Sequence, residues 1–273
     1  MRAVLALDLD QTLIYSARSA GRTAGTETVW VEDYEGAPLS LMTARAHQRL
    51  AALTARHDVV PVTTRTAEQF LRVRLPGDLP RAVCCNGGVL LVDGVRDPAW
   101  DARVAHELSQ VAPAGQVAAR VRHVASHDWV KTVREVEELF VYLVAHRRDQ
   151  IPADWLSSTT AWAATLGWRV SLQGRKVYVV PEQLSKGAAA GLVADRLGGP
   201  LLAAGDSLLD RCLLERAVFA VRPAHGELHE IGYQREGLHV TAQRGARAAE
   251  ELLEVLETRA DALTAVRPAA APA

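Results

Sequence analysis

The sequence predicts an α/β protein whose core is a parallel β-sheet and whose middle section is an inserted α+β unit. Two observations support this prediction. At both ends of the chain, short apolar runs that end in polar residues alternate with segments of helical periodicity, which is typical of a parallel sheet covered by helices. Between residues 95 and 178 the order changes to helix, strand, strand, helix, strand, strand, which is typical of an α+β unit.

The first expected strand, residues 4–7, is an apolar run followed directly by Asp8 and Asp10. Because an unpaired buried carboxylate is costly, we expect both acids where the strand emerges, at the edge where open α/β sheets bind ligands. Side chains alternate along a strand, so Asp8 and Asp10 should point to the same side. Together with Thr12 they indicate a site for a divalent cation and acid–base chemistry, although an ordinary Asx-type turn explains this stretch equally well.

Residues 15–42 form an excursion before the next helix. Its first part, residues 16–28, is rich in Ser, Gly and Thr and is expected to be a loop. Residues 29–36 and 38–42 predict two short strands around a Gly turn. Such a hairpin close to Asp8 would either cover the site or decorate the surface, and the sequence leaves both interpretations open.

The alternating pattern then continues up to the insertion. Its expected elements are a helix over residues 43–57, a strand over 58–62, a helix over 67–74, and strands over 81–85 and 89–92. The first of these strands runs into Thr63-Thr64-Arg65. Asn86-Gly87 lies between two apolar runs, which is a strong signal for a hairpin turn.

The insertion contains two helices and two predicted hairpins. Its expected elements are a long helical stretch over residues 102–123 that is interrupted around Pro113 to Gly115, strands over 129–135 and 139–146, a helix over 153–166, and strands over 168–172 and 176–180. Basic residues lie on or near the ends of these strands: Lys131, Arg134, Arg147, Arg148, Arg175 and Lys176. They would either bind the anionic body of a ligand or form a solvated basic face, which is the simpler interpretation for most of them.

After the insertion the alternating pattern resumes. Its expected elements are a helix over residues 186–197, strands over 201–204 and 218–221, and a helix over 242–258. Ser185 is a suitable N-cap for the first of these helices. The strand over 201–204 ends just ahead of Asp206 and Asp210.

These elements divide the chain into a discontinuous core and an insertion. We assign residues 1–94 and 179–257 to a Rossmann-like core and residues 95–178 to the α+β insertion. The tail, residues 258–273, is rich in Ala and Pro and is expected to be disordered.

The bulk composition is that of an ordinary globular protein. The chain has 273 residues and a net charge of −1, from 31 basic and 32 acidic residues, so no global field favours nucleic acid or an anionic membrane as a partner. No apolar run is long enough to span a bilayer. Three cysteines, of which Cys84 and Cys85 are adjacent, give neither a disulfide framework nor a zinc site, so the reducing cytoplasm is the expected location.

Polar residues that follow the core strands are expected to converge, because parallel strands end at the same edge of a sheet. Asp8 and Asp206 offer the hard oxygen ligands that Mg²⁺ prefers. Thr63 and Lys186 would bind a phosphate group through hydrogen-bond donors and a positive charge. Asp210 would either orient a metal-bound water or hold Lys186.

Four short motifs follow one another along the chain. They are Asp8-Leu9-Asp10-Gln11-Thr12, Thr63-Thr64-Arg65, Lys186 and Gly205-Asp206-Ser207-Leu208-Leu209-Asp210. In this order they resemble the motifs of the haloacid dehalogenase-like (HAD) phosphatases. The insertion resembles the α/β cap of the Cof-type branch, which includes sucrose-phosphate phosphatase, mannosyl-3-phosphoglycerate phosphatase and phosphomannomutase. Asn86-Gly87-Gly88 resembles the turn ahead of that cap, and Ser185-Lys186-Gly187 resembles the lysine motif of the branch.

The resemblance implies a Mg²⁺-dependent phosphatase that acts on a small phosphorylated metabolite, by family analogy a sugar or polyol phosphate. Asp8 would be the nucleophile that forms an aspartyl-phosphate, and Asp10 would protonate the leaving alcohol. Mg²⁺ would be bound by Asp8, the Asp10 carbonyl and Asp206. Thr63, Thr64 and Lys186 would bind the phosphate group, with Asp210 and Asn86 in supporting positions.

Two positions depart from the pattern of the branch. Gln11 stands where Gly is common, and Leu209 stands where an Asn often precedes the last Asp.

Two other functions stay open: a phosphosugar mutase of the phosphomannomutase kind, and a non-catalytic protein that binds a phosphorylated metabolite. The Asp8/Asp10 pair argues against the second, because a pure binder needs no proton donor there. The sequence predicts neither the individual substrate nor the oligomeric state.

Overall fold

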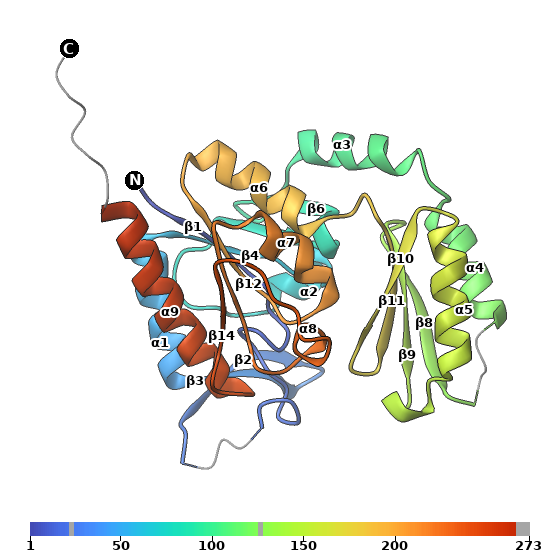
Figure 1. Ribbon diagram of the computed structural model, residues 1–273, viewed down its shortest axis with the longest axis horizontal. Helices are drawn as coiled ribbons and strands as arrows, with labels where there is room; N and C mark the ends of the chain where they lie inside the picture. Colours follow the sequence, from blue (N-terminus) through green and yellow to red (C-terminus); the bar gives the residue numbers. More distant parts are fainter. Residues whose placement is uncertain (22–24, 125–127, 266–273) are drawn as a thin grey trace.

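The computed structural model describes residues 1–21, 25–124 and 128–265 of the chain (Figure 1). Its main sheet has five strands in the order β14-β13-β12-β1-β4, and every neighbouring pair is parallel. These strands are β1 (Val4–Leu7), β4 (Asp58–Pro61), β12 (Leu201–Ala204), β13 (Phe219–Arg222) and β14 (Leu238–Val240). The apolar β1 lies between two other strands and is fully buried. The predicted parallel-sheet core is confirmed.

Helices cover both faces of this sheet (Figure 1). α1 (Ala44–Arg56) packs with α9 (Ala246–Ala265) on one side, and α6 (Lys186–Leu197) packs with α7 (Arg211–Arg216) on the other. Apolar residues at helical spacing produce this packing, because they form a continuous stripe on each helix. On α9 the stripe consists of Ala249, Leu252, Leu253, Leu256 and Ala260, all buried.

A second sheet forms the predicted insertion and is antiparallel, in the order β10-β11-β9-β8. Its strands are β8 (Val130–Val136), β9 (Phe140–Ala145), β10 (Trp168–Gln173) and β11 (Lys176–Pro181). The helices α4 (Ala114–Val124) and α5 (Ala153–Ala164) cover one face of it, and the short helix η2 (Arg148–Gln150) follows β9 (Figure 1). The α+β character of the insertion is confirmed.

The helical stretch expected over residues 102–123, with its interruption around Pro113, is two helices, α3 (Pro98–Leu108) and α4. Pro113 directly precedes α4, because proline lacks the N–H that a continuous helix needs. The core boundary expected at residue 179 falls inside β11, whose last residue, Pro181, pairs with Trp168 of β10. We therefore propose that the chain returns to the core after Pro181.

Two smaller sheets extend the core. β2 (Thr28–Tyr34) and β3 (Ala37–Thr43) form the predicted hairpin, whose register shifts between Trp30 and Glu32. β5 (Arg81–Cys84), β6 (Val89–Val92) and β7 (Val95–Arg96) form a three-stranded sheet. A parallel bridge from Val62 to Val83 places β5 beside the end of β4. The remaining short helices are α2 (Ala67–Leu71), η1 (Cys85–Gly87), η3 (Leu208–Asp210) and α8 (Glu227–Glu230).

The expected disordered tail is wrong for its first part, because α9 continues to Ala265. This part of the helix is anchored by side chains of the core: Asp261 contacts Arg56 at 2.6 Å and His57 at 3.0 Å, and Ala260 is buried. The rest of the predicted tail, residues 266–273, lies outside the described residues. Within the described ranges, no helix combines the length and the apolar character that crossing a membrane requires.

Candidate active site

The carboxyl ends of three neighbouring strands meet at the centre of the main sheet. Leu7 of β1 is in register with Ala204 of β12 and with Pro61 of β4. The Asp8 backbone N–H donates to the Ala204 carbonyl at 3.0 Å, and the Val62 N–H donates to the Leu7 carbonyl at 2.8 Å. The residues that follow these strands are therefore held against one another, as the parallel topology predicts.

Lys186, the first residue of α6, is buried and connects two of the acids. Its Nζ donates to Asp8 Oδ1 at 2.7 Å and to Asp210 Oδ1 at 2.5 Å. A positive charge at a helix N-terminus is unfavourable to the helix dipole, and the two carboxylates offset this cost. The Thr12 hydroxyl donates to the other oxygen of Asp8 at 2.9 Å, so the Asp8 carboxylate is fixed from two directions.

Asp210 is fully engaged by protein donors. Its Oδ2 accepts from the Ser207 hydroxyl at 2.6 Å, from the Ser207 N–H at 2.9 Å and from the Asp206 N–H at 3.2 Å. Its other oxygen accepts from Lys186. The residue therefore joins the loop that carries Asp206 to the lysine, and it has little capacity left for a metal.

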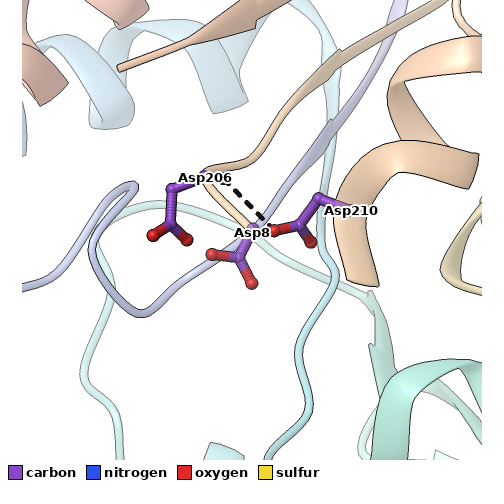
Figure 2. A group of neighbouring side chains, drawn as sticks. All are labelled: Asp8, Asp206 and Asp210. Atoms are coloured by element: carbon purple, nitrogen blue, oxygen red, sulfur yellow. Dashed lines mark hydrogen bonds between the residues drawn. The ribbon is translucent and has the colours of Figure 1, made fainter. Parts of the chain in front are cut away.

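Asp206 is different. The residue is buried, but its carboxylate oxygens accept no hydrogen bond from another described residue. They are therefore available to coordinate a cation. Oxygens of Asp8, Asp206 and Asp210 lie within 4.8 Å of one another, and Figure 2 shows the three carboxylates grouped together. Gly226, at the start of α8, packs directly on Asp206, where a Cβ would clash with the carboxylate.

The pKa values of Asp8 and Asp206 are raised. Burial, followed by the charge of Asp210, raises the pKa of Asp8 from 3.8 to about 7. Burial, followed by the charge of Asp8, raises the pKa of Asp206 well above its ordinary value. When ionised, three carboxylates and the Lys186 ammonium leave two negative charges, which one divalent cation would neutralise. The donor set fits Mg²⁺, with Asp8 and Asp206 as the available ligands.

Thr63 and Asn86 lie next to this group. Thr63 is buried, and its hydroxyl accepts from the Arg65 N–H at 3.1 Å. The Asn86 N–H donates to the Thr63 carbonyl at 2.9 Å, and its Nδ2 donates to the Leu184 carbonyl at 3.2 Å. Asn86 thereby fastens the segment after β4 to the segment that leads into Lys186.

Asp10 is separate from the buried group. Its side chain is 50% exposed and is held by Arg65, whose Nε and one terminal nitrogen each donate to a carboxylate oxygen at 2.8 Å. The partial burial would raise the pKa of Asp10, but the hydrogen bonds and charge of Arg65 outweigh it and lower the pKa below its ordinary value. The metal contact expected from Asp10 would have to come from its backbone carbonyl.

The β2–β3 hairpin contributes a residue that sequence reasoning missed. Glu32 is completely buried, and its Oε2 accepts from Arg65 at 2.8 Å and from the Ser40 hydroxyl at 2.7 Å. The hairpin is therefore tied to the Asp10 side of the site through the ion pairs of Arg65 with Asp10 and Glu32. The register shift beside Glu32 breaks the alternation of buried and exposed positions, so the pattern carries no signal for it.

Thr64 points to the insertion. Its hydroxyl lies 3.4 Å from the hydroxyl of Tyr178 on β11. Thr64, Asp10 and Arg65 line a cavity of about 1470 Å³ whose opposite wall comes from the second sheet. Cavities of this kind between two structural units are common ligand-binding sites.

Helix α8 joins the two units next to the acids, which the sequence did not reveal. Glu227 accepts from the Leu208 N–H at 2.9 Å, from the Ser171 hydroxyl at 2.8 Å and from the Leu172 N–H at 3.2 Å. Glu230, on the same helix, pairs with Arg148 of η2 at 2.6 Å. The insertion is thus anchored to the segment that follows Asp206.

The unusual Gln11 has a visible support. Its φ of 65° is left-handed, a conformation that is strained for most residues other than Gly. The His225 ring donates from Nε2 to the Gln11 carbonyl at 2.8 Å, and its Nδ1 accepts from the Gly245 N–H at 3.2 Å. The histidine therefore holds the turn beside Asp10 in this left-handed conformation.

Comparison with known proteins identifies the fold. No protein-family model and no curated protein sequence matches the chain. Among solved structures, it resembles the sucrose-phosphatase from Synechocystis, with 14% identity and a TM-score of 0.66 over 94% of this chain and 98% of that one. It also resembles a HAD subclass IIB sugar phosphatase (11% identity, TM-score 0.60) and a trehalose-6-phosphate phosphatase related protein (19% identity, TM-score 0.56), each over 94% of this chain and 98% of the other.

These likenesses cover the main sheet and the insertion together. The chain has the fold of the HAD-superfamily phosphatases, a Rossmann-like core with an inserted α/β cap, which confirms at the level of the fold the resemblance drawn from the four motifs. We refer to the insertion from here on as the cap.

Proposed function

We propose that this chain is a Mg²⁺-dependent phosphatase that hydrolyses a small phosphate monoester, with sugar or polyol phosphates as the substrate class. The convergence of Asp8, Lys186 and Asp206 at one edge of the sheet carries this proposal. A large cavity adjoins that edge and is lined by Asp10. The solved structures with this fold include proteins described as sugar phosphatases.

The reaction proceeds in two displacements. A carboxylate oxygen of Asp8 attacks phosphorus, the bond from phosphorus to the leaving oxygen breaks, and Asp10 delivers a proton to that oxygen. Water then attacks the phosphorus of the aspartyl-phosphate while Asp10 accepts a proton from it, which regenerates Asp8 and releases inorganic phosphate. Lys186 keeps Asp8 oriented and offsets negative charge in both steps.

Two groups support these steps. Asp8, Asp206 and the Asp10 carbonyl would hold Mg²⁺, which when bound neutralises the phosphoryl oxygens and keeps the displacement in line. The Thr63 hydroxyl would donate a hydrogen bond to the phosphate group. Asp10 must be protonated to act as an acid, and the negative charge of an arriving phosphate dianion raises its pKa in that direction.

The test is a screen of phosphorylated metabolites, with phosphate release measured in Mg²⁺ and after its removal by EDTA. We expect turnover only with Mg²⁺, and a loss of at least about 10³-fold in the Asp8→Asn variant, because this variant lacks the nucleophile. Asp78→Asn is the matched control, since Asp78 is an exposed carboxylate outside the site. Full activity of Asp8→Asn would contradict the proposal, and strict dependence on a sugar bisphosphate would favour a mutase.

The cysteines are consistent with the proposed cytoplasmic location. Cys84 and Cys85 are buried and unpaired, and Cys212 is a partly exposed free thiol. Disulfides therefore contribute nothing to this fold, which suits a reducing compartment.

A further inference from the structure

The cap wall of the cavity is strongly basic. It is formed by the segment after β9, residues 146–149, and by the turn between β10 and β11. The cationic side chains that line the whole cavity are Arg18, Arg65, Arg147, Arg148, Arg175 and Lys176. Its lining includes only two carboxylates, Asp10 and Asp149.

Three of these cations are already compensated. Arg65 pairs with Asp10 and Glu32, and two further pairs join Arg147 to Asp149 and Arg148 to Glu230. These side chains therefore have structural partners. They need no ligand to balance their charge.

Arg175, in the turn between β10 and β11, and Lys176, the first residue of β11, are not compensated. Neither has a carboxylate within 4.0 Å among the residues that the structure describes. Arg175 donates one hydrogen bond, from Nη1 to the His146 carbonyl at 3.2 Å, so most of its five N–H groups are available to another acceptor. Both side chains are exposed to the cavity rather than packed into the sheet.

The Lys176 ammonium is held in place by two aromatic rings. It lies 5.7 Å from the ring centre of Tyr142 and 6.0 Å from that of Tyr178. Tyr178 in turn contacts Thr64 at the edge of the core. The positive charge therefore faces the same space as Asp10. Burial raises the pKa of Asp10, Arg65 lowers it, and the charge of Lys176 lowers it further.

A purely neutral sugar would give these two cations nothing to bind except hydroxyl groups. Charged oxygens bind guanidinium and ammonium groups through hydrogen bonds about twice as strong as neutral ones. A partly enclosed cavity in which cations outnumber carboxylates also raises the local concentration of anionic ligands. The solvated basic face that the sequence favoured for most cap cations does not describe this pair, because both line the cavity.

We infer that the substrate carries a second anionic group on its leaving part, a carboxylate or a second phosphate, which Arg175 and Lys176 bind while the scissile phosphate lies at Asp8. This inference rests on the proposed function and specifies its substrate class. The second anion would orient the leaving oxygen toward Asp10, so it would contribute to selectivity as well as affinity.

The test compares glucose 6-phosphate, whose leaving part is neutral, with 6-phosphogluconate, whose leaving part carries a carboxylate, and glucose 1,6-bisphosphate, whose leaving part carries a second phosphate. We expect kcat/KM to be at least about tenfold higher for one of the two doubly anionic compounds than for glucose 6-phosphate. Preference for the gluconate would identify a carboxylate, and preference for the bisphosphate would identify a phosphate. The kcat/KM for the preferred compound with a second anionic group, divided by the kcat/KM for glucose 6-phosphate, is the ratio to follow. This ratio should fall about tenfold in Arg175→Gln and about tenfold in Lys176→Gln.

Lys131→Gln is the matched control, because Lys131 is an exposed cap lysine on β8 that does not line the cavity. It should leave both the ratio and the basal rate unchanged. Two results would overturn the inference and leave the phosphatase assignment intact. One is that the wild-type enzyme hydrolyses all three compounds equally well. The other is that Arg175→Gln and Lys176→Gln leave the ratio unchanged.

No hydrolysis of any compound, p-nitrophenyl phosphate included, would instead contradict the proposed function. Calorimetric titration of the same three compounds in Mg²⁺ decides the inference independently of turnover. Tighter binding of a doubly anionic compound that is lost in Lys176→Gln supports the second-anion site, and equal binding of all three compounds overturns it.

Discussion

At the residue scale, the chemistry depends on acids that differ sharply in their surroundings. Asp210 is saturated by four donors, Asp8 is fixed by Lys186 and Thr12, and Asp206 has a buried carboxylate without a hydrogen-bond partner among the described residues. In the proposed mechanism, the same residue type therefore serves as a support, a nucleophile and a metal ligand. The surroundings, rather than the residue type, separate these roles.

The raised pKa values of Asp8 and Asp206 predict how metal-free stability depends on pH. A folded-state pKa raised from 3.8 to about 7 contributes stability that is fully present below about pH 4 and is lost as the pH rises through about 7. In EDTA, the melting temperature of the wild type should therefore decline over this interval more than that of Asp206→Asn. Mg²⁺ should raise the melting temperature of the wild type and not that of the variant.

Thermal unfolding followed by circular dichroism would check this prediction, with Asp78→Asn as the control for loss of a carboxylate. Equal pH slopes in the wild type and Asp206→Asn would show that the buried acids are not destabilising one another. A retained Mg²⁺ response in the variant would show that the cation binds elsewhere.

Arg65 predicts a second effect at this scale. Because Arg65 holds the pKa of Asp10 below its ordinary value, Arg65→Gln should raise that pKa. The carboxyl ¹³C resonance of Asp10, assigned with Asp10→Asn, would then titrate at higher pH. Arg74→Gln is a suitable control, because Arg74 makes an exposed pair with Asp33 at 2.7 Å. An unchanged titration of Asp10 in Arg65→Gln would contradict the role given to Arg65.

Sequence reasoning succeeded with the residues that follow core strands and failed with those that reach the site from elsewhere. Asp8, Asp206 and Lys186 are found because the topology dictates where strands and helices end. Glu32 reaches the site from a hairpin whose register shift hides its burial. Only the folded chain shows that this residue and Arg65 share a contact.

At the element scale, the turn η1 sets the distance between the Thr63-Thr64-Arg65 motif and α6. Its residues Cys85, Asn86 and Gly87 all have positive φ, at 51°, 57° and 98°. Gly87 is required there for a second reason, since a Cβ would lie 2.5 Å from the Ser185 carbonyl oxygen. The predicted hairpin turn is therefore also the surface on which the start of α6 rests.

A matched pair of glycines tests this packing. Gly94 also has positive φ, at 77°, but a Cβ there meets no atom within 4 Å, so Gly94→Ala should cost only about 1–2 kcal/mol of backbone strain. Gly87→Ala adds the clash with Ser185 and should reduce the free energy of unfolding by more than Gly94→Ala. Urea denaturation measures both, and equal losses would contradict the close approach.

The same scale shows what an element pattern can and cannot predict. The strands of the main sheet follow from apolar runs, and the order of the cap elements follows from the change in pattern. The interruption of the helical stretch around Pro113 was also predictable, because proline breaks a helix. The continuation of α9 to Ala265 was not, because it depends on particular contacts that segment periodicity averages out.

At the scale of the whole molecule, two sheets of different kind enclose one cavity. Glu227 of α8 binds the cap at Ser171 and the loop at Leu208, so the cap position is coupled to the segment that carries Asp206. No sequence signal predicts this contact, because both partners are single polar residues far apart along the chain. The fold class and the insertion were nevertheless predictable, since they depend on the order of elements alone.

The most direct test of the central claim is ¹⁹F NMR with beryllium fluoride, which binds as a phosphoryl mimic and requires no knowledge of the substrate. We predict a bound fluoride signal that requires Mg²⁺ and disappears in Asp8→Asn and in Asp206→Asn, while Asp78→Asn retains it. A bound signal that persists in Asp8→Asn would contradict the claim that Asp8, Lys186 and Asp206 gather around one metal-bound phosphoryl group.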